Sequence, residues 1–411
     1  MKCCNLQIEY NDVFEGILLY FIIPLLFFYF PIFTSGVIFL LLFFSSERYF
    51  KVSTIFLSLF VAFIAINIKG EGDLSTYFQI YLDGDNQVNL YNLKLYRYIS
   101  FEFIGFLDLS VQVYSFISMF LLSMLSCLVI IESASLLKIN QFNLVFKFVF
   151  LIMFLKQIPF GIFSNYENTL AFTVFCYGFL RYCKGNIFLG FFLAFIACLI
   201  HASLFLFFVF MVGVYVLKRI PIIITIMIGC IIPIFLILLT SFGDILGSGI
   251  VNVIISKWTV YTEGAWSQYI RSEKLLYYFY IINLLILIPF IVKFYHTNDM
   301  KIRKLIIFFI LSIPTLIYLL NFKTIAGRYI FNGGWFFILC TMSFFYSRYS
   351  TKYLYLGVIL VIVLNPLNLL SSITLINSID TNILEKNITD MFLENVFINN
   401  TERDQTGESR I

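Results

Sequence analysis

The sequence is poor in charge. Only 12% of its 411 residues are Asp, Glu, Lys or Arg, and 61% are hydrophobic, whereas a soluble domain is about 25% charged and about 45–50% apolar. So few charges cannot cover 52 Phe and 26 Tyr side chains in water, and a water-soluble globule is excluded. The formal net charge of +4 is also too small for a nucleic-acid-binding surface, so we expect no nucleic-acid partner.

Metal ligands are equally scarce. The chain has two histidines, His201 and His296, and its eight cysteines contain no Cys-x-x-Cys pair. Zinc sites need clustered Cys and His ligands, so we expect no metal site. Most of the cysteines lie inside apolar runs, which is typical of small buried residues and not of a disulfide framework. The sequence indicates no bound cofactor.

Long apolar runs, in contrast, are abundant. They lie near residues 16–44, 52–68, 113–131, 146–160, 168–181, 187–217, 221–241, 275–292, 305–320, 334–347 and 353–370. In lipid only helices satisfy the backbone of so many separate segments, so we expect an all-α polytopic integral membrane protein with about 11–13 transmembrane helices and long outward-facing loops. Residues 1–370 form one transmembrane domain, and 371–411 form a polar, flexible, outward-facing tail. The run at 16–44, which contains Pro24 and Pro31, fits one crossing or two.

Basic residues recur in the short connections between these runs. They are Arg48/Lys51, Lys138/Lys147, Arg181/Lys184, Lys218/Arg219, Lys293/Lys301/Arg303/Lys304 and Arg348/Lys352. Because Lys and Arg concentrate in cytoplasmic loops, these connections should share the cytoplasmic side. The segment 187–217 lies between two of them, so it must form a hairpin that turns at His201, or a re-entrant pair. The outward loops are then 69–112, 161–167, 242–274 and 321–333.

The first outward loop contains two stretches that suggest a site. If the stretch at its start is helical, Asp73, Tyr77 and Tyr81 share one face, at i, i+4 and i+8. A carboxylate flanked by aromatic rings suits a sugar, whose C–H face stacks on a ring while its hydroxyls need acceptors. The alternative interpretation is an interfacial tyrosine belt beside an exposed acid.

The second stretch places Glu102 among aromatic residues. Burial there would favour the neutral carboxyl, which would suit a general acid or base. The alternative is that Glu102 is the ion-pair partner of Arg97 or of another cation.

Two further polar groups lie at other outward turns. His201 interrupts an apolar run, where a titratable side chain is costly and usually functional, although it could instead fix the hairpin through an interhelical hydrogen bond. Arg328, at the mouth of a helix, could clamp a phosphate or diphosphate bidentately, with Lys323 and Arg271 adding positive potential. The alternative for Arg328 is a snorkelling anchor at the lipid headgroups.

In this order and on one face, these stretches resemble the bacterial EpsG/Wzy-like family of polysaccharide polymerases, over residues 50–335. The resemblance rests on Asp73 and Tyr77 after Gly72, on Glu102-Phe103-Ile104-Gly105-Phe106, on Ile200-His201-Ala202-Ser203 and on Arg328-Tyr329. Family members typically also carry an Arg at the start of the fifth run, where this chain has Glu167-Asn168.

The resemblance implies a metal-independent, inverting-type glycosyltransferase. It would join undecaprenyl-diphosphate-linked oligosaccharide units into O-antigen or a related surface polysaccharide, at the outer face of the bacterial inner (plasma) membrane, with its active site facing the periplasm. Its partners would be the lipid-linked oligosaccharide, membrane lipid and a chain-length regulator. The implied base candidates are Asp73, Glu102 and His201, and the implied substrate-binding residues are Arg328, Arg271, Lys323, Tyr77, Tyr81, Trp266 and Tyr329.

Two other functions remain open, a flippase or exporter of the same lipid-linked sugars and a membrane glycan acyltransferase. A flippase should carry charges deep in several helices, whereas this chain keeps nearly all its charge at helix ends and in loops. An acyltransferase would place its catalytic His beside an acid or a second His, and His201 has neither nearby in sequence.

Overall fold

The computed structural model describes residues 22–45, 47–68, 73–92, 94–139, 144–158, 166–241, 287–331 and 386–393, with isolated residues between 259 and 285. The helices are α2 (Ile23–Tyr29), α3 (Pro31–Phe44), α4 (Glu47–Ala65), α5 (Asp73–Leu82), α6 (Gln87–Tyr91), α7 (Leu95–Phe106), α8 (Val113–Leu136), α9 (Leu144–Gln157), α10 (Tyr166–Cys183), α11 (Ile187–Ile200), η3 (Ala202–Leu204), α12 (Phe205–Leu217), α13 (Ile222–Ser241), α16 (Leu287–Phe294), α17 (Met300–Leu319), α18 (Lys323–Ala326), the π-helix η5 (Gly327–Phe331) and α22 (Ile388–Leu393). These ranges contain no β-strand, so the predicted all-α class is confirmed for the described part of the chain.

The apolar runs that fall in these ranges become helices with similar bounds. The run at 16–44 is broken at Phe30, whose backbone is not helical, and α3 begins at Pro31. Proline suits this first helical position because its missing N–H would have no intrahelical partner there. The predicted runs at 334–347 and 353–370 lie outside the described residues.

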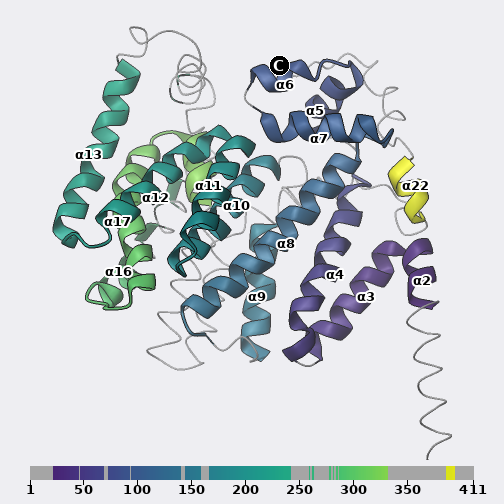
Figure 1. The fold of residues 1–411 in the computed structure, drawn as a ribbon, viewed down its shortest axis with the longest axis horizontal. Helices are drawn as coiled ribbons and strands as arrows, with labels where there is room; N and C mark the ends of the chain where they lie inside the picture. Colours follow the sequence, from purple (N-terminus) through teal and green to yellow (C-terminus); the bar gives the residue numbers. More distant parts are fainter. Residues whose placement is uncertain are drawn as a thin grey trace, which may run out of the picture.

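The predicted outward loop 69–112 is largely helical. Its helices α5, α6 and α7 lie across the upper ends of α4 and α8 and form what we call the cap (Figure 1). Leu74 and Phe78 on α5, and Phe101 and Ile104 on α7, are buried. This spacing gives each short helix one apolar face, which packs on the rest of the protein and holds the helix in place.

Beneath the cap the helices form one continuous bundle. α4 packs on α3 and on α8, and α8 packs in turn on α10. α10 pairs with α11, and α17 lies against α12 and α13 (Figure 1). The aromatic side chains of Phe175, Phe179 and Phe308 fill the space between α10 and α17. α10 is therefore the helix that links the two sides of the bundle.

Basic residues of several connections meet at one end of the bundle, which we call the basic end. Glu132 near the end of α8 pairs with Lys184 and Arg181 at the end of α10. Lys304 near the start of α17 donates from Nζ to the Tyr182 carbonyl at 2.9 Å. The turns between α3 and α4 and between α16 and α17 lie on this same lower side in Figure 1. The opposite end, which carries the cap, is the cap end.

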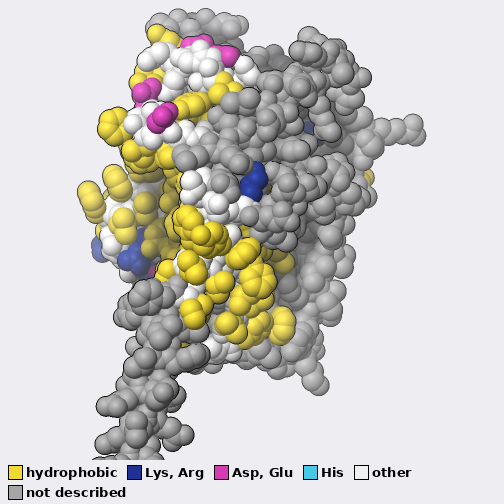
Figure 2. Space-filling view, turned by 90° about the vertical axis from the view of Figure 1, so that its right-hand side faces the viewer, with side chains coloured by type: hydrophobic (Ala, Val, Ile, Leu, Met, Phe, Trp, Pro, Cys, Tyr) yellow, Lys and Arg dark blue, Asp and Glu magenta, His cyan; other side chains and the backbone are white. Residues whose placement is uncertain are grey.

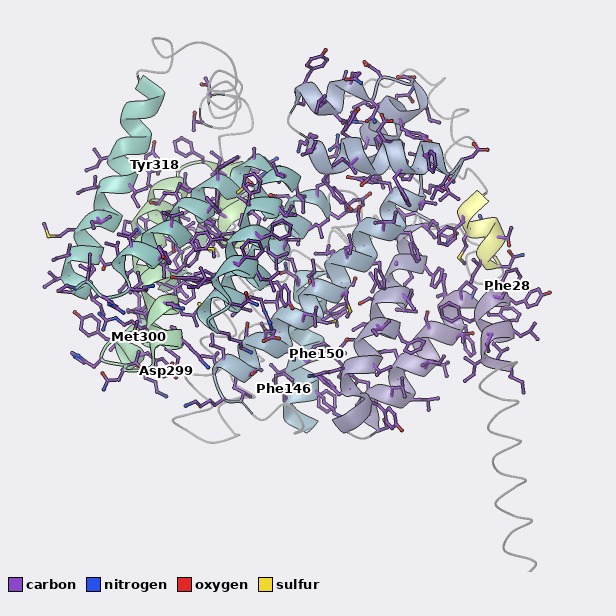
Figure 3. The ribbon with its side chains drawn as sticks, viewed as in Figure 1. Phe28, Phe146, Phe150, Asp299, Met300 and Tyr318 are labelled. Atoms are coloured by element: carbon purple, nitrogen blue, oxygen red, sulfur yellow. The ribbon has the colours of Figure 1, made fainter. Side chains whose placement is uncertain are left out.

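α17 shows the two ends clearly. Its N-cap residue Asp299, whose side chain accepts from the Lys301 amide at 2.9 Å, and Met300 lie at the basic end, and Tyr318 lies at the other end of the helix (Figure 3). α8 and α17 are long and apolar enough to cross a membrane. The shorter apolar helices include α3, α11, α12 and most of α4. Helix length therefore does not establish the predicted number of crossings.

The outer faces of the helices are apolar and some of the inner faces are not. Phe33, Leu41, Phe188 and Met227 are each at least 64% exposed. Figure 2 shows apolar side chains over the middle of one face and acidic side chains near its upper end. Small hydroxyl residues line the buried faces instead, among them Ser53, Ser58, Ser118, Ser126, Thr169 and Thr173. This distribution is compatible with lipid around the bundle, since water would favour the reverse.

Part of the predicted flexible tail is packed on the protein. α22 places Met391 in a buried position and Phe392 against Phe116 of α8, with ring centroids 5.0 Å apart. The Ser110 amide donates to the Phe392 carbonyl at 3.3 Å. The prediction of a flexible tail therefore does not extend to these six residues of α22.

Glycines set the close approach of α10 and α11. A Cβ at Gly190 would lie 2.6 Å from the Tyr182 Cβ and 3.0 Å from the Gly178 carbonyl oxygen. Neither neighbour can move without shifting its helix, so only a residue without a side chain fits. Small residues at a helix contact let two backbones pack closely, which is the usual means of association in lipid.

We expect Gly190→Ala to destabilise the protein by about 1–3 kcal/mol, the usual cost of overpacking a core. The matched control is Gly105→Ala, because a Cβ there would lie 3.6 Å from the Tyr81 hydroxyl, an ordinary contact. Thermal unfolding of both variants in detergent would measure the difference. Equal melting temperatures for the two variants would contradict the tight α10–α11 contact.

Candidate functional site

His201 forms the turn between α11 and α12, as the hairpin interpretation predicted. Its backbone is extended, with φ −147° and ψ 117°, so α11 ends there, and the short helix η3 starts at the next residue. The imidazole Nδ1 lies 2.7 Å from the Ser203 hydroxyl and accepts from the Ser203 amide at 3.3 Å. The half-buried His201 ring therefore caps η3.

Tyr329 joins this turn from a segment 126 residues later in the chain. Its hydroxyl donates to the Ser203 carbonyl. Its ring packs on Phe172 of α10 and Phe207 of α12, with centroids 5.6 and 5.2 Å away. Burial raises the pKa of the Tyr329 phenol, and the nearby charge of Arg328 opposes this only in part. The phenol therefore remains a hydrogen-bond donor at neutral pH, and η5 is tied to the His201 turn.

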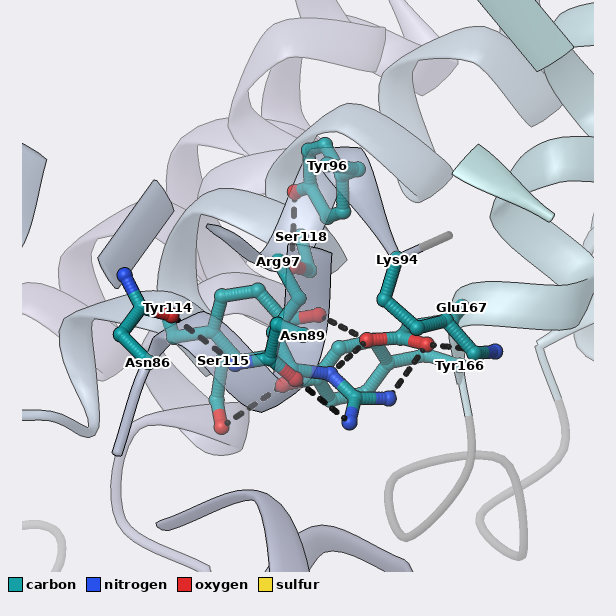
Figure 4. A network of polar contacts seen from close by, with 10 residues as sticks. All are labelled: Asn86, Asn89, Lys94, Tyr96, Arg97, Tyr114, Ser115, Ser118, Tyr166 and Glu167. Carbon is teal, nitrogen blue, oxygen red and sulfur yellow. Dashed lines mark hydrogen bonds and ion pairs between the residues drawn. The ribbon is translucent and has the colours of Figure 1, made fainter. Parts of the chain in front are cut away.

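A second polar cluster joins the cap to the bundle. Arg97 of α7 binds Glu167, in the first turn of α10, in a bidentate ion pair with Nε–Oε1 2.6 Å and Nη2–Oε2 2.7 Å (Figure 4). Both side chains are buried, at 5% and 2% exposed. Tyr114 at the start of α8 donates to the same carboxylate, and Lys94 lies 3.5 Å from it. One carboxylate thus connects three helices.

The Arg97 guanidinium is held on its other sides as well. Nη1 donates to Asn89 of α6 at 3.4 Å, and the guanidinium carbon lies 3.2 Å from the centroid of the Tyr77 ring. Burial acts to lower the pKa of Arg97, but its hydrogen bonds to Glu167 and the charge of that carboxylate outweigh burial and raise the pKa above its ordinary value. Arg97 is therefore a permanent cation inside the cap.

The two clusters lie at the same level of the bundle. α10 and α11 are antiparallel and meet at Gly178 and Gly190. Glu167 lies eleven residues before Gly178, and His201 lies eleven residues after Gly190. Both therefore lie at the cap end, and Phe172, five residues after Glu167, contacts Tyr329. The α10–α11 register brings the His201 turn and the Glu167 ion pair to one end of the protein.

The structure changes the interpretation of two predicted residues on the cap. Glu102 is exposed and accepts from Asn86 Nδ2 at 2.7 Å, so the prediction that it is desolvated was wrong, and so was its pairing with Arg97. The physical reason is that Arg97 projects toward the bundle, where Glu167 binds it. Tyr77 stacks on Arg97, so that ring face is not open to a sugar.

The start of the loop is helical, since α5 begins at Asp73 and runs to Leu82. Tyr81 packs on Phe101 with ring centroids 5.2 Å apart and is half-buried. The Asp73 side chain, Trp266 and Arg271 lie outside the described residues. Lys323 and Arg328, in α18 and η5, are both half-buried.

Sequence reasoning missed the role of Glu167. It is the acid that opens an apolar run on the same side as Arg97, a signal that could have suggested the pair. The next residue, Asn168, is also buried, and its Oδ1 has no hydrogen-bond partner among the described residues. Buried charged and amide groups are costly unless they are paired, and the Glu167 carboxylate meets this requirement through Arg97.

The described residues contain no group of three or more His, Cys, Asp or Glu side chains that could hold a metal ion. The chemistry that the cap end offers is hydrogen bonding from an imidazole, and cationic contacts from Arg328 and Lys323. Comparison with known proteins finds no matching family model, no matching curated protein and no matching solved structure.

Proposed function

We propose that this protein is a polytopic membrane glycosyltransferase that polymerises undecaprenyl-diphosphate-linked oligosaccharides at the cap end. The proposal rests on the hydrogen bond from the Tyr329 hydroxyl to the Ser203 carbonyl. This bond brings the residue that follows Arg328 to the turn that His201 forms. These residues belong to separate stretches of the resemblance to polysaccharide polymerases. Their contact gives those short stretches a common place in the fold.

The arrangement of charge supports a membrane setting. The buried charged residues of the described chain, Arg97, Lys147 and Glu167, all lie within the first turn of a helix. An enzyme that works at a membrane face needs no charge midway along its helices, whereas a flippase needs it along a path. The polymerase is therefore the better supported of the two functions.

The proposed reaction gives roles to residues that the resemblance implies. Transfer of a growing glycan needs a base near the acceptor hydroxyl and a cation near the departing diphosphate. Arg328, with Lys323 and Arg271, is the proposed clamp for the diphosphate. Asp73, Glu102 and His201 are the candidates for the base, and Tyr81 and Trp266 are the candidates for sugar stacking.

A labelling experiment tests the orientation of the bundle. With native cysteines replaced, Gln87→Cys on the cap should react with a membrane-impermeant maleimide added outside intact cells. Asn298→Cys at the basic end should react only after the membrane is opened. Both positions are exposed, so access alone does not separate them. Labelling of both cysteines from the same side would exclude the proposed transmembrane arrangement.

The function itself is tested with purified protein in lipid nanodiscs and a synthetic undecaprenyl-diphosphate-linked oligosaccharide. A polymerase would convert this substrate into a ladder of products that each grow by one repeat unit. Each transfer would also release undecaprenyl diphosphate, which mass spectrometry detects. Transport without new glycosidic bonds, measured in vesicles loaded with the same substrate, would instead favour a flippase.

A further inference from the structure

Two lysines at the basic end lie on tyrosine rings. Lys304 Nζ lies 4.3 Å from the centroid of the Tyr182 ring, and Lys218 Nζ lies 4.4 Å from the centroid of the Tyr215 ring. The charge of Lys218 acts on Lys304, so the two pairs are neighbours. Neither lysine forms an ion pair with a carboxylate of the described residues. Two ammonium groups are therefore held near each other without a counterion in the part of the chain that the structure describes.

Hydrogen-bond donors at the same place are also unsatisfied. The Tyr182 side chain is fully buried, and its hydroxyl has no hydrogen-bond partner among the described residues. This hydroxyl lies within electrostatic range of Tyr215, whose ring carries Lys218. Arg303 donates from Nη2 to the Ile220 carbonyl at 3.2 Å, but its buried Nε has no partner in the described ranges. Buried donors are costly without an acceptor, and this end of the bundle lacks one.

Helix ends account for some of these cations but not for the unsatisfied donors. A lysine near the C-terminus of a helix is favourable, as for Lys218 after α12 and for Lys304 against the last carbonyls of α10. The Tyr182 hydroxyl gains nothing from this effect, and phenylalanine would fill the same space. Arg303 lies in the first turn of α17, where the helix dipole disfavours a cation. An anion would satisfy all of these groups.

From this geometry we infer a binding site for the phosphate of an anionic phospholipid at the basic end, formed by Lys218, Lys304 and the Tyr182 hydroxyl. A phosphodiester offers a negative charge and several acceptor oxygens, which match two ammonium groups and a phenol. The site lies at the opposite end of the bundle from the residues that the proposed function uses. It goes beyond that function and does not depend on it.

The surface beside Lys218 favours a lipid over a soluble phosphate. Val212, Tyr215 and Val216 share one face of α12, and all three are exposed. Tyr215 therefore joins this apolar face to the ammonium group that lies on its ring. A headgroup phosphate at Lys218 would leave its acyl chains along α12, where the outer surface of the bundle is apolar.

Lipid binding can be measured without any assay of activity. Purified protein in a neutral detergent would be melted with and without dioleoyl phosphatidylglycerol, since a ligand of the folded state raises the melting temperature. Phosphatidylglycerol should raise it, and phosphatidylcholine, which has no net charge, should raise it much less. Inorganic phosphate is the probe for a soluble anion. Equal protection by phosphatidylcholine would overturn the site, and equal protection by inorganic phosphate would overturn the assignment to a lipid.

A pair of lysine variants separates this site from a general attraction to cations. Lys218→Gln should weaken phosphatidylglycerol binding at least about fivefold, the effect of one lysine contact with an anionic headgroup. The matched control is Lys301→Ala. Lys301 is exposed and its charge acts on Lys304, so its loss tests the effect of charge alone and should change binding by less than about twofold in salt. Equal weakening by the two variants would overturn the site.

Tyr182→Phe tests the buried hydroxyl. Phenylalanine keeps the ring beneath Lys304 and removes only the hydroxyl. Without lipid, the melting temperature of the variant should equal or exceed that of the wild-type protein, because an unsatisfied buried group is lost. With phosphatidylglycerol, the wild-type protein should gain more. A lower melting temperature of the variant without lipid, or an equal gain in both proteins with lipid, would overturn the place of this hydroxyl in the site.

Discussion

Glu167→Gln should destabilise the protein by about 3–5 kcal/mol, the usual cost of removing one member of a buried ion pair. The carboxylate binds Arg97 in two places and also accepts from Tyr114. An amide can reproduce one acceptor contact but not the charge, so the buried Arg97 cation loses its counterion. The loss should appear as a lower melting temperature and as faster proteolysis of the cap.

The chain offers two controls for this prediction. Glu102→Gln removes an equal charge from an exposed position of the same cap, and it should leave the melting temperature unchanged. The double variant Arg97→Met with Glu167→Leu should recover much of the lost stability, because it leaves no unpaired buried charge. If Glu167→Gln and Glu102→Gln melted alike, the Arg97–Glu167 pair would not hold the cap.

On the proposed function, Arg328→Ala should lower polymer formation by about 10²–10³-fold, because a cation beside the departing diphosphate would stabilise the charge that develops in the transition state. Arg328→Lys should recover little, since lysine keeps the charge but lacks the planar fork. Size-resolved gels of the polysaccharide, together with the abundance of each variant in membranes, would measure the effect.

Lys301→Ala is the matched control for Arg328. Lys301 is an exposed cation at the start of α17, at the basic end, and its loss should leave polymer formation intact. Long polymer at wild-type levels from Arg328→Ala would show that this arginine is a headgroup anchor. The diphosphate clamp would then have to be sought at Arg271 or Lys323.

The sequence by itself determined the helical class and the approximate bounds of the apolar helices. A helix satisfies its own backbone, so a run of apolar residues predicts one without knowledge of its neighbours. It also determined the hairpin: basic residues at both ends of 187–217 required a return, and His201, the polar residue in its middle, forms the turn. The grouping of several basic connections at one end of the bundle follows from the same charge pattern.

Only the tertiary structure decided which polar groups meet. Arg97 had Glu102 five residues away, but α7 presents Arg97 to the bundle and leaves Glu102 exposed, so its partner is Glu167, 70 residues later. The same packing placed Tyr77 on Arg97 and brought Tyr329 to the Ser203 carbonyl. Spacing along one helix sets which residues share a face, but the partner of that face depends on how separate helices pack. That packing depends in turn on contacts such as Gly178 against Gly190, whose effect appears only when both helices are in place.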